Sequence, residues 1–217
     1  MGMATATHRQ TVERLLDRAG TTYAEEAGIR LRDKPMPLFQ LVILCMLASK
    51  PIDAAIATRA GREMFRAGLR TAHTVRDADR AALIAAFGRA HYVRYDESSA
   101  TRAVDIAAAV CDEYSGDLRR LAVAGERDVS QTRKLLQQFK GIGQTGADIF
   151  LREVQDTWTW VRPYFDERAT AAAADLGLPG DPGKLAALAP RRAANLAAAL
   201  VRVSLDDELG QSVRAHT

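Results

Sequence analysis

The chain has 217 residues, of which 47% are apolar and 26% are charged. This length and composition fit one soluble domain or two small lobes, and they exclude a disordered, collagen-like or disulfide-stapled chain. Thirty basic against 27 acidic side chains give a net charge of +3, which permits an anionic partner without requiring one.

Helical patterns follow one another along the whole chain. Residues 1–10 lack the apolar core and cleavage site of a secretory signal. The longest apolar run, residues 41–48, falls well short of the roughly 20 residues that span a bilayer, so we expect no membrane association. The predicted helices cover residues 8–19, 38–49, 52–67, 78–87, 97–115, 128–139, 145–155, 166–176 and 190–204.

Proline and glycine mark where these helices are expected to begin and end. Pro51 suits the first turn of the third helix. Residues 177–183 hold two Pro and three Gly and are predicted to form a loop. No segment alternates with period two, so we predict an all-α protein of packed helices. The glycines expected to stop helices are Gly68, Gly88, Gly116 and Gly177.

The two cysteines, Cys45 and Cys111, lie in apolar helical stretches and are too few for a disulfide framework. Buried thiols suit a reducing compartment, so we expect a cytoplasmic protein. The four histidines show no spacing typical of metal ligands; they are His8, His73, His91 and His216.

The most specific stretch runs from Leu135 to Ile149. A helix with an apolar face leads into Gly141-Ile142-Gly143, and a second helix rich in small residues follows at once. The glycines permit positive φ and close approach of another backbone, and Ile142 is expected to pin the two helices together. The pattern predicts a helix-hairpin-helix; the alternative is an ordinary helical corner in which glycine only caps.

The start of the second helix is a candidate phosphate site. Its N–H groups from Gly143 to Ala147 are expected to lack partners within the helix and, with the helix dipole, to favour an anion. Such a site binds a nucleic-acid backbone without reading its sequence. The candidate DNA-binding residues here are Gly141, Ile142, Gly143, Gln144, Thr145 and Gly146.

Three segments follow one another in an informative order: residues 47–53 after an apolar helix, the hairpin, and residues 164–168 at a later helix start. This order resembles the endonuclease III superfamily of DNA glycosylases. That family carries L-L-S-x-Q-x-x-D, then L-P-G-V-G-x-K-T-A in its helix-hairpin-helix, then V-D-x-H. The likeness covers roughly residues 37–205 and implies a DNA repair glycosylase.

By this resemblance Asp166 is the catalytic aspartate. Its carboxylate would stabilise the positive charge that builds on the sugar as the N-glycosidic bond breaks, or deprotonate the attacking water. The alternative is that Asp166 caps the N-terminus of the following helix. The two roles are compatible, because an aspartate that caps a helix can also act in catalysis. Arg168 stands in place of the family's histidine. Thr145 replaces the lyase lysine and cannot form a Schiff base, so the resemblance implies a monofunctional enzyme.

The resemblance also bears on cofactors. The family's iron–sulfur cluster needs four cysteines near the C-terminus, and no cysteine follows Cys111, so no cluster is expected. The resemblance implies that the backbone carbonyls of Gln137, Phe139 and Ile142 hold a monovalent cation between the hairpin and a DNA phosphate. No other cofactor is expected.

A base must leave the duplex before it is excised. The resemblance implies that Lys50, between Ser49 and Pro51, fills the gap; the alternative is a solvated lysine at a helix end. Four aromatic residues within residues 158–165 are candidates for the base pocket or for the core: Trp158, Trp160, Tyr164 and Phe165. Tyr92 and Tyr95 are further candidates.

Several charged residues near the hairpin in sequence are either phosphate contacts or solvated side chains. The basic ones are Arg133, Lys134, Arg152 and Arg162, and Asp148 is expected to be solvated.

We expect two helical lobes with a DNA-binding groove between them. Residues 37–150 would form one lobe, ending in a helix-hairpin-helix at about 128–155. Residues 1–36 would pack on residues 151–217, which carry Asp166. An Asp166 buried in an ion pair away from any groove would refute the catalytic role.

The expected function is excision of a damaged or mispaired base from duplex DNA, by a monomer. One alternative is a non-catalytic DNA-binding protein of the same fold. Another is a helical protein–protein adaptor that uses the hairpin only as a corner.

Overall fold

The structure, a computed structural model, describes residues 2–214. Within this range the chain forms helices α1 to α14 and no strand, which confirms the all-α class. By its internal contacts the chain divides into two units. The hairpin unit is Tyr23–Leu151, and the terminal unit combines the residues up to Thr22 with those from Arg152 onward. The domain boundaries expected at residues 36 and 150 stay a prediction.

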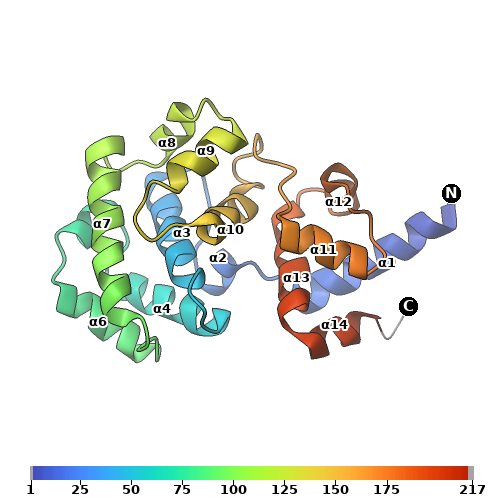
Figure 1. The fold of residues 1–217 in the computed structure, drawn as a ribbon, viewed down its shortest axis with the longest axis horizontal. Coiled ribbons are helices and arrows are strands. Elements are labelled where there is room, and N and C mark those ends of the chain that lie inside the picture. Colours follow the sequence, from blue (N-terminus) through green and yellow to red (C-terminus); the bar gives the residue numbers. More distant parts are fainter. Residues whose placement is uncertain (1, 215–217) are drawn as a thin grey trace. The chain divides into compact units, whose positions relative to one another are not determined.

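The hairpin unit is built around α3 (Pro35–Ala48), in which every residue from Pro37 to Leu47 is buried. Apolar side chains on all sides of a helix are typical of one surrounded by other elements. Indeed α3 packs against three helices of this unit: α2 (Tyr23–Glu26), α4 (Ala54–Arg66) and α7 (Asp96–Tyr114) (Figure 1). The remaining helices that lie wholly in this unit are α5 (Ala72–Arg76), α6 (Arg80–Arg89), α8 (Arg119–Ala124) and α9 (Val129–Leu136).

The terminal unit is built around α13 (Ala193–Leu205). Its neighbours are α1 (Gly2–Ala19), α11 (Glu167–Asp175), α12 (Pro182–Leu188) and α14 (Asp207–Arg214). Alanines fill much of this core, and small side chains let the helices approach closely. The two ends of the chain are joined by hydrogen bonds, since Arg18 donates to the Ser212 carbonyl at 2.7 Å and Asn195 donates to the Gly20 carbonyl at 2.8 Å.

Two predicted helix boundaries were wrong. Pro51 does not open the third helix, because Asp53 caps α4 by accepting the Ala55 N–H at 2.6 Å. Gly88 lies inside α6, which continues to Arg89. Three other glycines have positive φ just beyond helix ends and confirm their predicted role as stops: Gly68, Gly116 and Gly177.

Five short helices were missed: α2, α5, α8, α12 and α14. Each has eight residues or fewer, too short for a helical period to stand out. The loop predicted over residues 177–183 is also shorter than expected, because α12 begins at Pro182. Across residues 2–214, no helix has both the length and the hydropathy to cross a bilayer.

Candidate nucleic-acid interface and aspartate site

Residues 137–143 connect α9 to α10 (Gln144–Val154) as a tight hairpin. Gly141 has a φ of +100°, and a Cβ there would lie 3.2 Å from Arg102 Cγ and 3.3 Å from Met46 Cγ. Glycine is therefore required at this position by conformation and by packing. Gly143 differs, because it does not have positive φ and no heavy atom lies within 4 Å of its Cβ position.

Two apolar side chains anchor the hairpin. Ile142 is buried, and its Cγ2 lies 3.3 Å from where a Cβ on Gly146 would be, so the first turn of α10 packs closely over it. This places Ile142 against α10, and its predicted role in pinning both helices stays a prediction. Phe139 is also buried and packs edge-on against Tyr114 of α7, with ring centroids 6.0 Å apart.

The first turn of α10 presents backbone donors. The Ala147 N–H donates to the Gly143 carbonyl at 3.0 Å, so Ala147 does not belong to the predicted set of free amides. Within the described part of the chain, the N–H groups of residues 143–146 donate to no other residue. Gly143, Gln144 and Thr145 are exposed, so their amides are open to an external acceptor.

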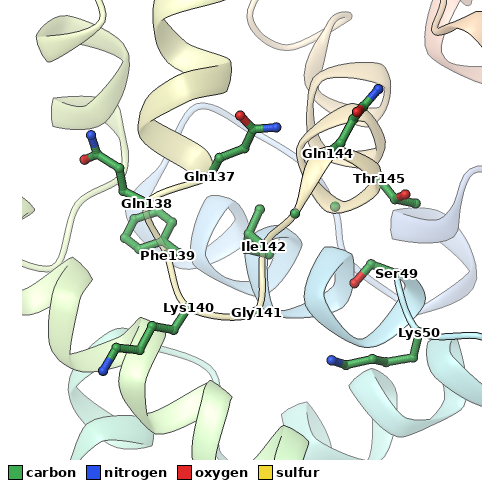
Figure 2. A pocket seen from close by; sticks show the side chains of 12 residues that line it. Ser49, Lys50, Gln137, Gln138, Phe139, Lys140, Gly141, Ile142, Gln144 and Thr145 are labelled. Carbon is green, nitrogen blue, oxygen red and sulfur yellow. The ribbon is translucent and has the colours of Figure 1, made fainter.

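A surface pocket of about 530 Å³ opens at the hairpin. Its lining comes from the end of α3, the hairpin loop and the start of α10, namely Ser49, Lys50 and residues 137–146. Figure 2 shows Lys50 and Lys140 on either side of the loop at Gly141. The structure thus brings Lys50, predicted from a distant segment, into one pocket with all six candidate residues of the hairpin.

An ion pair joins the two helices of the hairpin. Arg133 of α9 and Asp148 of α10 lie 2.6 Å apart, and the Asp148 side chain is only 15% exposed. The expectation that Asp148 is solvated was therefore wrong, because the hairpin turns α9 back toward α10. The pair also engages Arg133, which was a candidate phosphate contact.

In the terminal unit, Asp166 is the N-cap of α11. Its Oδ1 accepts the Ala169 N–H at 2.9 Å, and its Oδ2 lies 2.5 Å from Nη1 of Arg152. The side chains of Arg152 and Asp166 are 4% and 9% exposed. The N-cap alternative for Asp166 is confirmed. The carboxylate is also buried in an ion pair, which is the first part of the condition set above against a catalytic role, and that role stays a prediction. Arg152, another candidate phosphate contact, is instead buried in this ion pair.

The segment before Asp166 is held by Gln155, which sequence reasoning missed. Its amide nitrogen donates to the carbonyls of Tyr164, at 2.8 Å, and Arg152, at 3.0 Å, while its oxygen accepts the Tyr164 N–H at 2.9 Å. Gln155 is fully buried. No local sequence pattern distinguishes such a glutamine from a solvated one, since its partner lies nine residues away.

The aromatic residues of this segment divide between core and surface. Trp158 is buried and stacks on the half-buried Trp160, with ring centroids 5.4 Å apart. Phe165 belongs to the core of the terminal unit, and Tyr164 is half-buried. The core alternative therefore accounts for Trp158 and Phe165, and a base-pocket role for the four stays a prediction.

Tyr92 is a core residue of the hairpin unit rather than a pocket residue. It is fully buried, and its hydroxyl lies 3.1 Å from Ser99 Oγ. Burial raises the pKa of Tyr92 above its usual range. Tyr95 is half-buried and lies beneath the guanidinium of Arg94, 5.4 Å from its ring centroid.

No group of three or more His, Cys, Asp or Glu side chains in residues 2–214 is arranged to hold a metal ion. His216 lies outside the described residues.

No protein-family model matches the chain. A comparison with curated proteins gives no significant match. Among solved structures, the chain is similar to one described as a trapped endonuclease III–DNA covalent intermediate, an estranged-adenine complex. The match has 16% identity and a TM-score of 0.49, and covers 90% of this chain and 85% of the other. A likeness of this degree assigns no activity to this chain.

Proposed function

We propose that this protein binds duplex DNA through the hairpin pocket and hydrolyses the N-glycosidic bond of a damaged or mispaired base. The observation that carries the proposal is the convergence of free backbone amides and two lysines on one pocket. Backbone amides at a helix start bind phosphate oxygens and are indifferent to the base sequence. This suits a protein that must find a rare lesion anywhere in a duplex.

Lys50 and Lys140 supply positive charge on either side of the loop. Each lysine that meets a phosphate releases a counterion, so affinity should fall steeply as salt concentration rises. The resemblance adds a monovalent cation on the carbonyls of Gln137, Phe139 and Ile142. The Phe139 carbonyl accepts the Ile142 N–H at 2.9 Å, which leaves a lone pair for such an ion. When bound, the cation would attract a DNA phosphate.

For base release we propose Asp166 as the carboxylate that stabilises the developing oxocarbenium ion or activates water. Its place after the hairpin in the chain matches the family order on which the sequence resemblance rests. We include in the proposal that Asp166 lies along a DNA groove and that the aromatic residues within 158–165 line the base pocket.

We expect hydrolysis without strand cleavage. Thr145, at the position of the family's lyase lysine, has no amine with which to form a Schiff base. The side-chain amines that line the pocket belong to Lys50 and Lys140, and we assign both to phosphate binding and not to attack on the sugar.

The test is cleavage of end-labelled duplexes that carry uracil, mismatched thymine, alkylated adenine or oxidised guanine. A monofunctional glycosylase gives breaks only after alkali treatment. Asp166→Asn should abolish these breaks and retain DNA binding at a temperature at which thermal unfolding shows the variant folded, because asparagine keeps the Ala169 contact but leaves Arg152 without its carboxylate. Breaks without alkali would contradict the monofunctional assignment and point to Lys50 or Lys140 as a lyase amine.

A second candidate is a DNA-binding protein without catalysis. It is favoured by the contacts of Asp166, because both carboxylate oxygens already have partners in the structure. Salt-sensitive binding to every duplex, with no base release from any, would select this candidate. A chain that neither binds DNA nor releases a base would refute both proposals and favour the protein–protein adaptor.

A further inference from the structure

Arg152 is a buried cation on the last turn of α10, and its Nη1 lies 2.5 Å from Oδ2 of Asp166. Replacing a buried ion pair by apolar side chains of similar volume is often neutral or stabilising, so stability alone is a weak reason for such a pair. The contact with the proposed catalytic carboxylate suggests another role.

We propose that Arg152 is a positioning residue that fixes the carboxylate of Asp166 in its reactive orientation. This inference rests on the proposed function. An aspartate carboxylate rotates easily about its last torsion, which is broad and nearly two-fold. Here the Ala169 N–H holds Oδ1 and the Arg152 guanidinium holds Oδ2, so contacts at both oxygens define the plane of the group.

Arg152 is itself held in place. Its side chain is 4% exposed, and its carbonyl accepts the Gln155 amide at 3.0 Å. The same glutamine exchanges two hydrogen bonds with Tyr164, two residues before Asp166. The end of α10 is therefore joined to the segment of Asp166 through backbone and side chain, as a rigid site requires.

The pairing leaves the carboxylate able to react. An ionised carboxylate has about four acceptor positions, and the two contacts described above use two of them. The remaining positions can take a water or face the sugar through the part of the side chain that is exposed. Arg152 therefore acts through Asp166 and does not itself touch the substrate.

The experiment compares base release by the full-length wild type, Arg152→Met and Arg152→Lys on the duplex that the wild type cleaves after alkali. Arg18→Met is the matched control, because Arg18 also makes a structural hydrogen bond in the terminal unit. Steady-state kcat and KM, DNA affinity and the thermal unfolding midpoint are measured for each variant. We expect Arg152→Met to lower kcat about 10- to 100-fold, the effect of a small misplacement of a catalytic group, with KM and DNA affinity unchanged.

Arg152→Lys keeps the charge but loses the planar fork, so we expect part of the lost kcat to return. Arg18→Met should keep the wild-type kcat. A folded Arg152→Met with wild-type or higher kcat would overturn the inference while leaving the proposed function intact. If the methionine variant does not fold, the lysine variant decides: lower kcat at constant KM supports the positioning role, and wild-type kcat overturns it. A wild type that releases no base overturns the proposed function and this inference together.

Discussion

Gly141→Ala tests whether the hairpin depends on the conformation that only glycine adopts readily. Position 141 has a φ of +100°, and an alanine there is strained by about 1–3 kcal/mol. The added methyl would also crowd Arg102 Cγ at 3.2 Å and Met46 Cγ at 3.3 Å. Arg102 is 42% exposed and can shift, but Met46 is fully buried.

Overpacking of a buried contact costs about 1–3 kcal/mol. The two effects together predict that Gly141→Ala lowers the free energy of unfolding by about 2–6 kcal/mol. Because the loop also carries the phosphate-binding amides, DNA affinity should fall with it. The assay is urea denaturation, followed by duplex binding at fixed salt under conditions in which the variant stays folded.

Gly143→Ala is the matched control. Its Cβ position is open, and its φ is not positive, so the free energy of unfolding should change by no more than about 0.5 kcal/mol. The methyl would nevertheless face the pocket and obstruct an amide–phosphate hydrogen bond. Bonds to charged groups contribute about 1.5–3 kcal/mol, so affinity should fall about 10- to 100-fold. Equal stability of Gly141→Ala and wild type, or equal destabilisation by both variants, would refute the reasoning.

Two further predictions concern charge and pH. Lys50→Gln and Lys140→Gln should each weaken binding to all duplex sequences alike and reduce the slope of log affinity against log salt by about one. Lys184 lies outside the pocket, so Lys184→Gln should change neither quantity. A loss of affinity that depends on the DNA sequence would contradict phosphate contact. Burial raises the pKa of the Cys111 thiol and that of the Tyr92 hydroxyl above their usual ranges, so both stay protonated in the folded state at pH values where the unfolded chain ionises. The free energy of unfolding should therefore fall as the pH rises from about 8.5 toward 11, and Cys111→Ala should reduce the first part of that fall in urea titrations. An unchanged free energy of unfolding up to pH 11 would show that neither group remains protonated.

Local signals predicted the hairpin well. Gly141 and Ile142 act through their own backbone and their nearest turns, so residue type and spacing suffice to place them. The same holds for Asp166 as an N-cap, because the accepting oxygen and the donating N–H are three residues apart. The start of α4 was less predictable, because Asp53 caps it where Pro51 was expected to open it.

The sequence by itself determined that this chain is helical, that a tight glycine hairpin joins two of its helices, and that an aspartate opens a later helix. Those properties follow from local periodicity and backbone freedom. Only the tertiary structure decided that Asp148 pairs with Arg133, that Arg152 is buried against Asp166 and that Gln155 holds Tyr164. A charged or amide side chain has the same local pattern whether solvated or paired, and its partner is chosen by how the helices pack.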